Sequence, residues 1–206
     1  MDEPDDAVLL ERWRGGDKAA GAVLLERHHE SLARFFMSKL GPEADDLVQA
    51  TFLGLLEGAL DRFRAEASFR TFLFGIARKK LLEHLRSAVR DRARFDPAHE
   101  TLAALEPSLG SALDARGQDK LLLAALRQLP IDTQMMLELH YWEGLRIREI
   151  AQVLELPINT VKTRMRRGRL SLDEHMRALA DSREALETTL RGLDGWAADL
   201  RRELDD

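Results

Sequence analysis

Apolar residues recur at intervals of three and four along nearly the whole chain, and this spacing constrains the fold more than any other feature. It is clear in Val8, Leu9 and Trp13, in Val23, Leu24, Leu32 and Phe36, in Leu47, Leu55 and Leu56, and in Leu121, Leu122, Ala125 and Leu129. An α-helix places residues three and four apart on one face. No stretch alternates strictly between apolar and polar residues over the length of a strand. The sequence therefore predicts an all-α fold.

Breaks in this periodicity divide the chain. The clear interruptions are Gly15-Gly16 and Gly41-Pro42. Helices are predicted near residues 5–14, 18–39, 43–61, 67–90, 118–129, 131–143, 147–154, 158–179 and 182–203.

The segment from residue 91 to residue 119 has the composition of a flexible acidic linker. Its periodicity is weak, prolines and glycines occur in it, and six acids outnumber three bases. A featureless tether would have the same composition, so no residue there is assigned a role. We expect two small helical domains, residues 1–90 and 120–175, followed by an acidic helical extension over residues 176–206.

Charge is distributed unevenly, and this affects the choice of partner. A net charge of −5 would argue against nucleic acid if it were spread evenly. Residues 1–10 carry four acids and no base, and residues 171–206 carry ten acids against five bases. Residues 145–170, by contrast, carry seven bases against two acids. One strongly basic segment is thus compatible with an acidic protein.

The chain contains no cysteine, which excludes disulfides, thiolate nucleophiles and zinc sites built on cysteine pairs. Its first residues are acidic where a secretory signal would be basic. No apolar run approaches the roughly 18 residues that a membrane span needs. We expect a cytoplasmic protein that does not insert into a membrane and uses no metal or other cofactor.

Residues 147–169 have the pattern of a helix-turn-helix. A first apolar face is followed by a break at Leu156-Pro157 and by a second apolar stripe that includes Val161 and Met165. Ala151 is small where the second helix would cross the first closely. Asn159 or Thr160 is expected to cap the second helix. The first face comprises Ile147, Ile150, Ala151 and Leu154.

Polar and cationic residues occupy the side of the second helix that faces away from Val161 and Met165. They can pair with phosphates and reach guanine edges in the major groove of DNA. A run of charge is often only a solvated helix face, but the short helix and tight turn before it favour binding to duplex DNA. The residues are Lys162, Thr163, Arg166, Arg167 and Arg169.

A resemblance to a known family becomes specific in the segment LPIDTQMMLELHYWEGLRIREIAQVLELPINTVKTRMRRGR. It is similar to region four of the bacterial sigma factors, and in particular to the extracytoplasmic-function (ECF) group of the sigma-70 superfamily. In that family the second helix reads the minus-thirty-five promoter element. The resemblance assigns this contact to Asn159, Thr160, Lys162, Thr163, Arg164, Arg166 and Arg167.

Two residues depart from the family pattern. Glu155 stands where glycine is usual in the turn, and Arg146 stands where a serine or threonine usually caps the first helix. A non-glycine residue in a left-handed conformation costs roughly 1 kcal/mol, and a lost cap costs about the same. We expect the turn to survive with reduced stability.

Aromatic and cationic residues interleave between residues 61 and 86, in DRFRAEASFRTFLFGIARKKLLEHLR. Such a surface suits single-stranded nucleic acid, although aromatic residues at helical spacing usually belong to a core. The segment resembles the sigma region that opens and reads the minus-ten element. The resemblance places Arg64, Ser68, Phe69, Arg70 and Thr71 near the loop that captures a flipped base, and Arg78, Lys79 and Arg86 along the helix that faces the promoter.

An amphipathic helix is predicted upstream of this segment, in DDLVQATFLGLLEGALDRF at residues 45–63. Taken alone, it could be a simple core helix. In the sigma family this element docks on the clamp coiled coil of core RNA polymerase, and the resemblance assigns that contact to Asp46, Gln49 and Phe52. Ala50 replaces a glutamate that is usual in the family.

The acidic tail continues the apolar spacing beyond Leu172. Packing on the second domain is favoured over a partner-binding arm. Because the tail adjoins the basic helix, we hypothesise that it shields the DNA-reading face until polymerase binds. Deleting residues 181–206 and measuring how the free protein binds a promoter fragment tests this, and an unchanged affinity would contradict it.

The leading hypothesis is a sigma factor. Such a protein binds core RNA polymerase, recognises promoter DNA as duplex and as melted strand, and helps to open it. An anti-sigma factor is a further expected partner. The alternative is a stand-alone helix-turn-helix regulator with an N-terminal sensing domain. Catalysis is disfavoured, with no catalytic residues expected, because the histidines lack HExxH spacing and no glycine-rich phosphate loop occurs.

Overall fold

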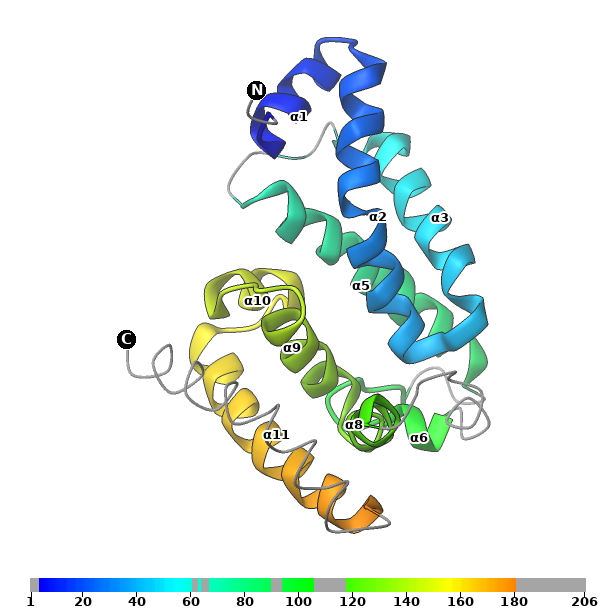
Figure 1. The fold of residues 1–206 in the computed structure, drawn as a ribbon, viewed down its shortest axis with the longest axis vertical. Coiled ribbons are helices and arrows are strands. Elements are labelled where there is room, and N and C mark those ends of the chain that lie inside the picture. Colours follow the sequence, from blue (N-terminus) through cyan, green and yellow to red (C-terminus); the bar gives the residue numbers. More distant parts are fainter. Residues whose placement is uncertain (1–3, 61–62, 64–66, 90–93, 106–117, 181–206) are drawn as a thin grey trace. The chain divides into compact units, whose positions relative to one another are not determined.

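The computed structural model describes residues 4–60, 63, 67–89, 94–105 and 118–180. Every named element in this part of the chain is helical, and an isolated bridge joins Thr101 to Pro130 (Figure 1). The predicted all-α fold is confirmed. The helix predicted at residues 182–203 lies outside the described residues, as does the rest of the tail. Among the described helices none is long and apolar enough to cross a membrane.

The chain divides into two compact units, Met1–Glu83 and His84–Asp206. The first holds α1 (Asp6–Arg14), α2 (Lys18–Leu40), the 3-10 turn η1 (Gly41–Glu43), α3 (Ala44–Gly54), the π-helical turn η2 (Leu55–Ala59) and most of α5 (Phe69–Ala88). The second holds the end of α5, α6 (Leu102–Leu105), α8 (Gln118–Leu126), α9 (Ile131–Tyr141), α10 (Ile147–Leu154) and α11 (Ile158–Leu179). The domain limits expected from the sequence stay a prediction.

Aspartate side chains begin the first two helices. The Asp5 carboxylate accepts a hydrogen bond from the Val8 backbone N–H at 2.8 Å, and that of Asp17 accepts one from Ala20 at 3.1 Å. Such caps satisfy donors that the start of a helix leaves unpaired. The helices pack α1 on α2 and α2 on α3. Their shared core includes Leu9, Leu24, Leu55, Phe63, Phe69 and Leu73.

The helix predicted at residues 43–61 is interrupted before its end. α3 stops at Gly54, the next turn is π-helical, and Gly58 has a φ of +116°. Glycine adopts this conformation readily because it has no Cβ. The apolar spacing of Leu55 and Leu56 continues through the interruption, so periodicity alone did not indicate it.

The most buried helix of the second unit is α9, whose residues from Ile131 to His140 are all buried. Both helices of the helix-turn-helix, α10 and α11, pack against it. Gly168 of α11 lies directly over Thr133 of α9. A Cβ atom built on Gly168 would lie 2.2 Å from Cγ2 of Thr133. Glycine therefore permits this crossing, and its neighbour could not be identified from the sequence.

The turn between α10 and α11 contains a left-handed residue that is not glycine. Glu155 has φ +56° and ψ +41°, the conformation expected from its place in the motif. Its N–H donates to the Gln152 carbonyl at 3.2 Å, and the N–H of Leu156 donates to the Ala151 carbonyl at 3.0 Å. These two bonds define a Schellman motif. The turn survives, with the strain of a side chain in the left-handed region.

Replacing Glu155 with glycine should raise the free energy of unfolding by up to about 1 kcal/mol. The gain comes from relief of the Cβ clash, and the greater freedom of glycine in the unfolded chain offsets part of it. Chemical denaturation measures the change. Glu155→Ala is the matched control because it removes the carboxylate and keeps Cβ. Equal stabilisation by the two variants would contradict strain as the cause.

The two helices of the motif begin differently from each other. At the start of α10 the Arg146 side chain makes no cap, as expected, but the Glu149 carboxylate accepts a hydrogen bond from the Arg146 N–H at 2.9 Å. This is half of a capping box. The prediction that Asn159 or Thr160 caps α11 is wrong. Pro157 is the N-cap residue, because its extended backbone precedes the helix and leaves both residues inside the first turn.

Part of the expected linker is folded. Residues 95–105, here called the strap, pack on the second unit and include the short helix α6. Leu102 is completely buried and Phe95 is 8% exposed. The strap therefore belongs to the folded part of the second unit, although its composition resembles that of a tether.

Candidate nucleic-acid interfaces

The outward side of α11 carries most of the residues predicted to read the minus-thirty-five element. Val161 and Met165 are completely buried against the rest of the unit. On the opposite side Asn159, Thr163, Arg166 and Arg167 are exposed, with Thr160 and Lys162 partly exposed beside them. The helical period therefore gathers these six residues on the solvent side of one helix.

Two arginines are the strongest cationic groups of this surface. Arg166 and Arg167 are exposed, and within the described residues neither makes an ion pair. Guanidinium groups bind phosphate and guanine edges through paired N–H donors. The Thr163 hydroxyl donates to the Asn159 carbonyl at 2.9 Å. This hydrogen bond orients a polar side chain between the cations.

Arg164 is placed differently from the other predicted residues of α11. Its guanidinium Nη1 lies 3.5 Å from Oδ2 of Asp132 at the start of α9. The Asp132 side chain is only 6% exposed, and that of Arg164 is 34% exposed. Arg164 thus faces Asp132 within the unit, whereas Arg166 and Arg167 are exposed to solvent.

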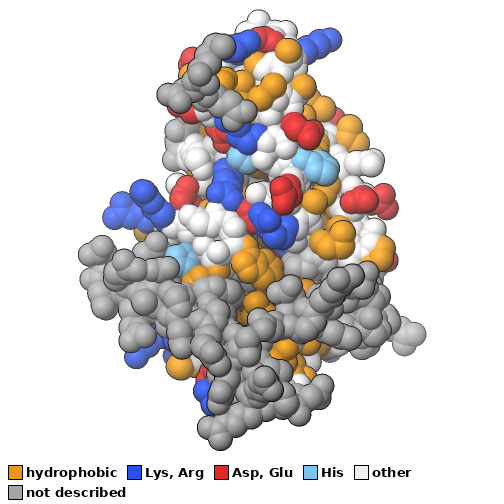
Figure 2. Space-filling view, viewed as in Figure 1, with side chains coloured by type: hydrophobic (Ala, Val, Ile, Leu, Met, Phe, Trp, Pro, Cys, Tyr) orange, Lys and Arg blue, Asp and Glu red, His pale blue; other side chains and the backbone are white. Residues whose placement is uncertain are grey.

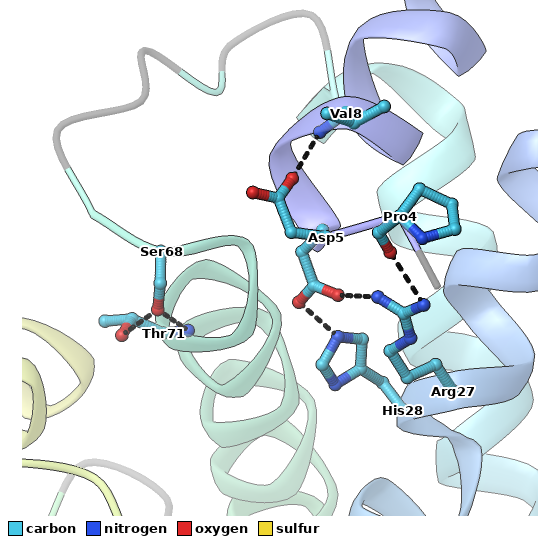
Figure 3. Close-up of polar contacts among 8 residues, drawn as sticks. Pro4, Asp5, Val8, Arg27, His28, Ser68 and Thr71 are labelled. Carbon is cyan, nitrogen blue, oxygen red and sulfur yellow. Dashed lines mark hydrogen bonds and ion pairs between the residues drawn. The ribbon is translucent and has the colours of Figure 1, made fainter. Parts of the chain in front are cut away.

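The predicted minus-ten residues at the start of α5 are divided between surface and core. The exposed Ser68 caps the helix, since its Oγ accepts a hydrogen bond from the Thr71 N–H at 3.1 Å and lies 2.8 Å from Thr71 Oγ1 (Figure 3). Thr71 is buried. Phe69 is 3% exposed, and its ring lies 5.5 Å from that of His28. Arg64 lies outside the described residues.

Four of the cations predicted to face the promoter lie along α5. Lys79 and Arg86 are exposed, and Arg70 and Arg78 are partly exposed. The Arg70 guanidinium lies 5.8 Å from the centre of the Phe74 ring, and that of Arg86 lies 5.8 Å from the Phe95 ring. Aromatic contacts of this kind hold a cation in place.

A network that the sequence did not indicate holds α1 on α2 (Figure 3). Asp6 binds Arg27 Nη1 at 2.9 Å through one carboxylate oxygen and His28 Nε2 at 2.6 Å through the other. Arg27 also donates to the Pro4 carbonyl at 2.9 Å. Because the His28 ring contacts that of Phe69, the network also reaches the beginning of α5. Asp6 was indistinguishable in the sequence from its acidic neighbours.

Polar and apolar side chains are exposed together on α3 and on the turn η2 that follows it. Asp46 and Gln49 are exposed, and Phe52 is partly buried with its ring stacked on His29 at 6.3 Å. Leu53 and Leu56 are more than half exposed, and Figure 2 shows apolar side chains reaching the surface where Figure 1 draws α2 and α3. Leu53, Leu56 and His29 are additions to the predicted set. An exposed apolar surface beside polar groups is typical of a protein contact.

Among the described residues no group of three or more histidine, aspartate or glutamate side chains is placed to hold a metal ion. The described sites consist of cations, amides and hydroxyls on helix surfaces, together with one apolar helix face. A helix-turn-helix with a cationic second helix, joined to a second all-helical unit, defines a DNA-binding protein of transcription.

Comparison with known proteins identifies the family. Residues 119–172 match the family model described as Sigma-70, region 4, and residues 24–100 match Sigma-70 region 2. The ECF RNA polymerase sigma-E factors of Salmonella typhimurium and Escherichia coli are each 31% identical over 186 residues, which cover 84% of this chain and 95% of the relative. The RNA polymerase sigma-H factor of Pseudomonas aeruginosa is 27% identical, covering 87% of this chain and 97% of the relative.

A solved structure supports the fold. The sigma factor RpoE of Bartonella quintana, in complex with the anti-sigma factor NepR, superposes with a TM-score of 0.57 at 23% identity, covering 80% of this chain and 99% of that one. The chain belongs to the ECF group of the sigma-70 family of RNA polymerase sigma factors.

Proposed function

We propose that this sigma factor uses three surfaces: the outward side of α11 for the minus-thirty-five element, the start and cationic side of α5 for the minus-ten element, and the exposed face of α3 for core polymerase. As a member of its family, the chain directs RNA polymerase to promoters and is not an enzyme. The proposal rests above all on the exposed cations of α11 in a helix-turn-helix.

The α11 surface suits duplex DNA in shape and charge. A second helix of this motif enters the major groove with its N-terminal residues near the base edges. Asn159 and Thr163 lie in the first two turns of α11, where amide and hydroxyl groups can reach bases. Lys162, Arg166 and Arg167 flank them and can neutralise phosphates. We assign base reading to the polar pair and DNA positioning mainly to the cations.

For the minus-ten element we assign different tasks to the surface and core residues. Ser68 and Arg70, together with Arg64, are the candidates for contact with a flipped base or its phosphates. Phe69 and Thr71 are buried, so we assign them the support of this loop. Arg78, Lys79 and Arg86 follow along α5 and suit contacts with the DNA backbone.

The polymerase contact is assigned to α3. Asp46 and Gln49 supply polar groups, and Phe52, Leu53 and Leu56 supply apolar area. A mixed surface of this kind buries apolar side chains within a polar rim when a partner docks. Because initiation takes place where polymerase meets the chromosome, we also propose that the protein acts in the cytoplasm. An anti-sigma factor is a further proposed partner, by analogy with the complex of the RpoE relative.

Transcription in vitro tests the proposal. Core RNA polymerase is mixed with the protein and fragmented genomic DNA of the host, and the starts of the transcripts are sequenced. A shared pair of promoter elements upstream of the starts is expected, and core polymerase alone should not yield it. A variant with Asp46→Ala and Gln49→Ala should lose binding to core polymerase and keep its fold by circular dichroism.

The alternative function, a stand-alone regulator, gives a different result. A regulator would bind its duplex without polymerase and would not start transcription when added to the core enzyme. If the core enzyme neither copurifies with the chain nor initiates with it, the proposal fails.

A further inference from the structure

The strap supplies hydrogen bonds that the start of α9 lacks. The carbonyl of Glu100 accepts a hydrogen bond from the Ile131 N–H at 2.9 Å, and the carbonyl of Pro97 accepts one from the Asp132 N–H at 2.9 Å. The N-cap residue of α9 is Pro130, which makes no side-chain cap. The first N–H groups of a helix have no partner within it. The strap therefore does for α9 what a capping side chain does elsewhere.

Further bonds fix the strap along its length. The Ala103 N–H donates to the Arg127 carbonyl at 3.0 Å, and the Arg127 guanidinium donates back to the Leu102 carbonyl at 3.3 Å. Arg127 is 2% exposed and Leu102 is fully buried. A buried guanidinium that donates to a buried carbonyl is a strong constraint, because breaking the bond removes a hydrogen bond from a charged group that water does not reach. The strap is thus joined to the end of α8 as well as to the start of α9.

Arg164 reaches this junction from α11. Its guanidinium lies 3.5 Å from the carboxylate of Asp132, the residue whose N–H donates to the Pro97 carbonyl. Asp96 of the strap directly precedes Pro97. The pKa of Asp96 is lowered, first by a hydrogen bond from the Ala98 N–H, then by one with His99, and further by the positive charge of Arg164. One arginine of the recognition helix therefore faces an acid of α9 that is itself bonded to the strap.

If Arg164 turned outward to bind a phosphate, Asp132 would lose its cation in a nearly closed position. The Asp132 side chain is 6% exposed, and separating the charges of a buried ion pair is costly because the carboxylate loses its compensating positive charge. Arg166 and Arg167 need no such rearrangement, because they are exposed on the outward side of the same helix. The geometry thus separates Arg164 from the cations that meet DNA.

We propose that Arg164 is a positioning residue, which fastens the recognition helix α11 to Asp132 of α9, and that it makes no contact with the promoter. This inference rests on the proposed function of α11 and changes the role that the family resemblance implied for Arg164. It also connects the strap to the DNA-binding unit, since the Pro97 carbonyl of the strap accepts the N–H of Asp132, the partner of Arg164.

The test compares two arginines on one helix. Full-length variants Arg164→Gln, Asp132→Asn and Arg167→Gln are examined for thermal unfolding and for binding to a promoter duplex recovered in the transcription experiment, at several salt concentrations. Arg164→Gln and Asp132→Asn should each lower the midpoint of unfolding by about 5 °C or more. The double variant should lose less than the sum of the two, because both changes break one pair. Arg167→Gln should leave the midpoint unchanged.

The salt dependence of binding separates positioning from contact. Arg167→Gln should lower the slope of log K against log salt by about one. Arg164→Gln should leave that slope unchanged, or alter it only as far as Asp132→Asn does. A slope lowered by about one in Arg164→Gln but not in Asp132→Asn would overturn the proposal, as would an unchanged midpoint in both. If Arg167→Gln leaves the slope unchanged, the proposed function of α11 fails, while the unfolding measurements still decide the role of Arg164.

Discussion

Alanine in place of Gly168 should destabilise the second unit by about 1–2 kcal/mol. The new Cβ would lie 2.2 Å from Thr133 Cγ2, so α11 must move away from α9 or Thr133 must leave its rotamer. Overpacking of this kind costs about 1–3 kcal/mol. The better helix propensity of alanine returns up to about 1 kcal/mol. The clash therefore outweighs the propensity, and a lower midpoint of unfolding should be measured by circular dichroism.

A second substitution should reverse this loss. Once Thr133→Ala has removed Cγ2, the nearest remaining side-chain atoms are at 3.7 and 3.8 Å from the new Cβ, which is ordinary contact. The double variant should therefore be more stable than the sum of the two single changes implies. Gly75→Ala is the matched control, because Gly75 lies within α5 and nothing is near the position of its Cβ. That variant should gain stability, and a loss there would refute the packing argument.

Removing positive charge from the outward side of α11 should weaken promoter binding in proportion to the phosphates lost. Lys162→Gln and Arg166→Gln should each lower the salt slope of duplex binding by about one, and together by about two. The affinity of each single variant should fall roughly tenfold at moderate salt, since one charge-assisted contact contributes about 1–3 kcal/mol. Fluorescence anisotropy with a labelled promoter duplex measures both quantities.

Arg177→Gln serves as the control on the same helix. Arg177 is exposed in the last turn of α11 and pairs with Asp173 at 3.0 Å. Its removal should leave the slope and the affinity unchanged, because it lies three turns beyond the residues that would enter the groove. If all three variants weakened binding equally, the binding would depend on the total positive charge of the protein and not on a helix docked in the groove.

The sequence was sufficient for most of the described helices and for the outward residues of α11, because both depend on short-range periodicity. Val161 and Met165 identify the inner side of that helix, so the cations opposite them follow directly. The left-handed turn at Glu155 was also predictable, since its place in the motif requires that conformation. These features depend on residues that lie close together along the chain.

Features that depend on distant partners were not predictable. The composition of the strap is that of a linker, and only its bonds to Ile131 and Asp132 reveal a folded element. Pro157 is a helix breaker by its residue type, and this hides from the sequence that it also occupies the N-cap position of α11. The helical period already leaves Arg164 out of the set that faces away from Val161 and Met165, but its partner Asp132 lies on another helix and could not be identified from the sequence. Whether each site residue has its assigned role stays a prediction.

The bonds from the strap to α9 also provide a means of observing its motion. In most helices the first amide hydrogens exchange with water quickly, because no carbonyl of the same helix holds them. In α9 the amides of Ile131 and Asp132 are held by the carbonyls of Glu100 and Pro97. Their exchange with deuterium therefore requires the strap to open. The exchange rates at these two amides report how often the strap leaves α9, both in the free protein and when polymerase is bound.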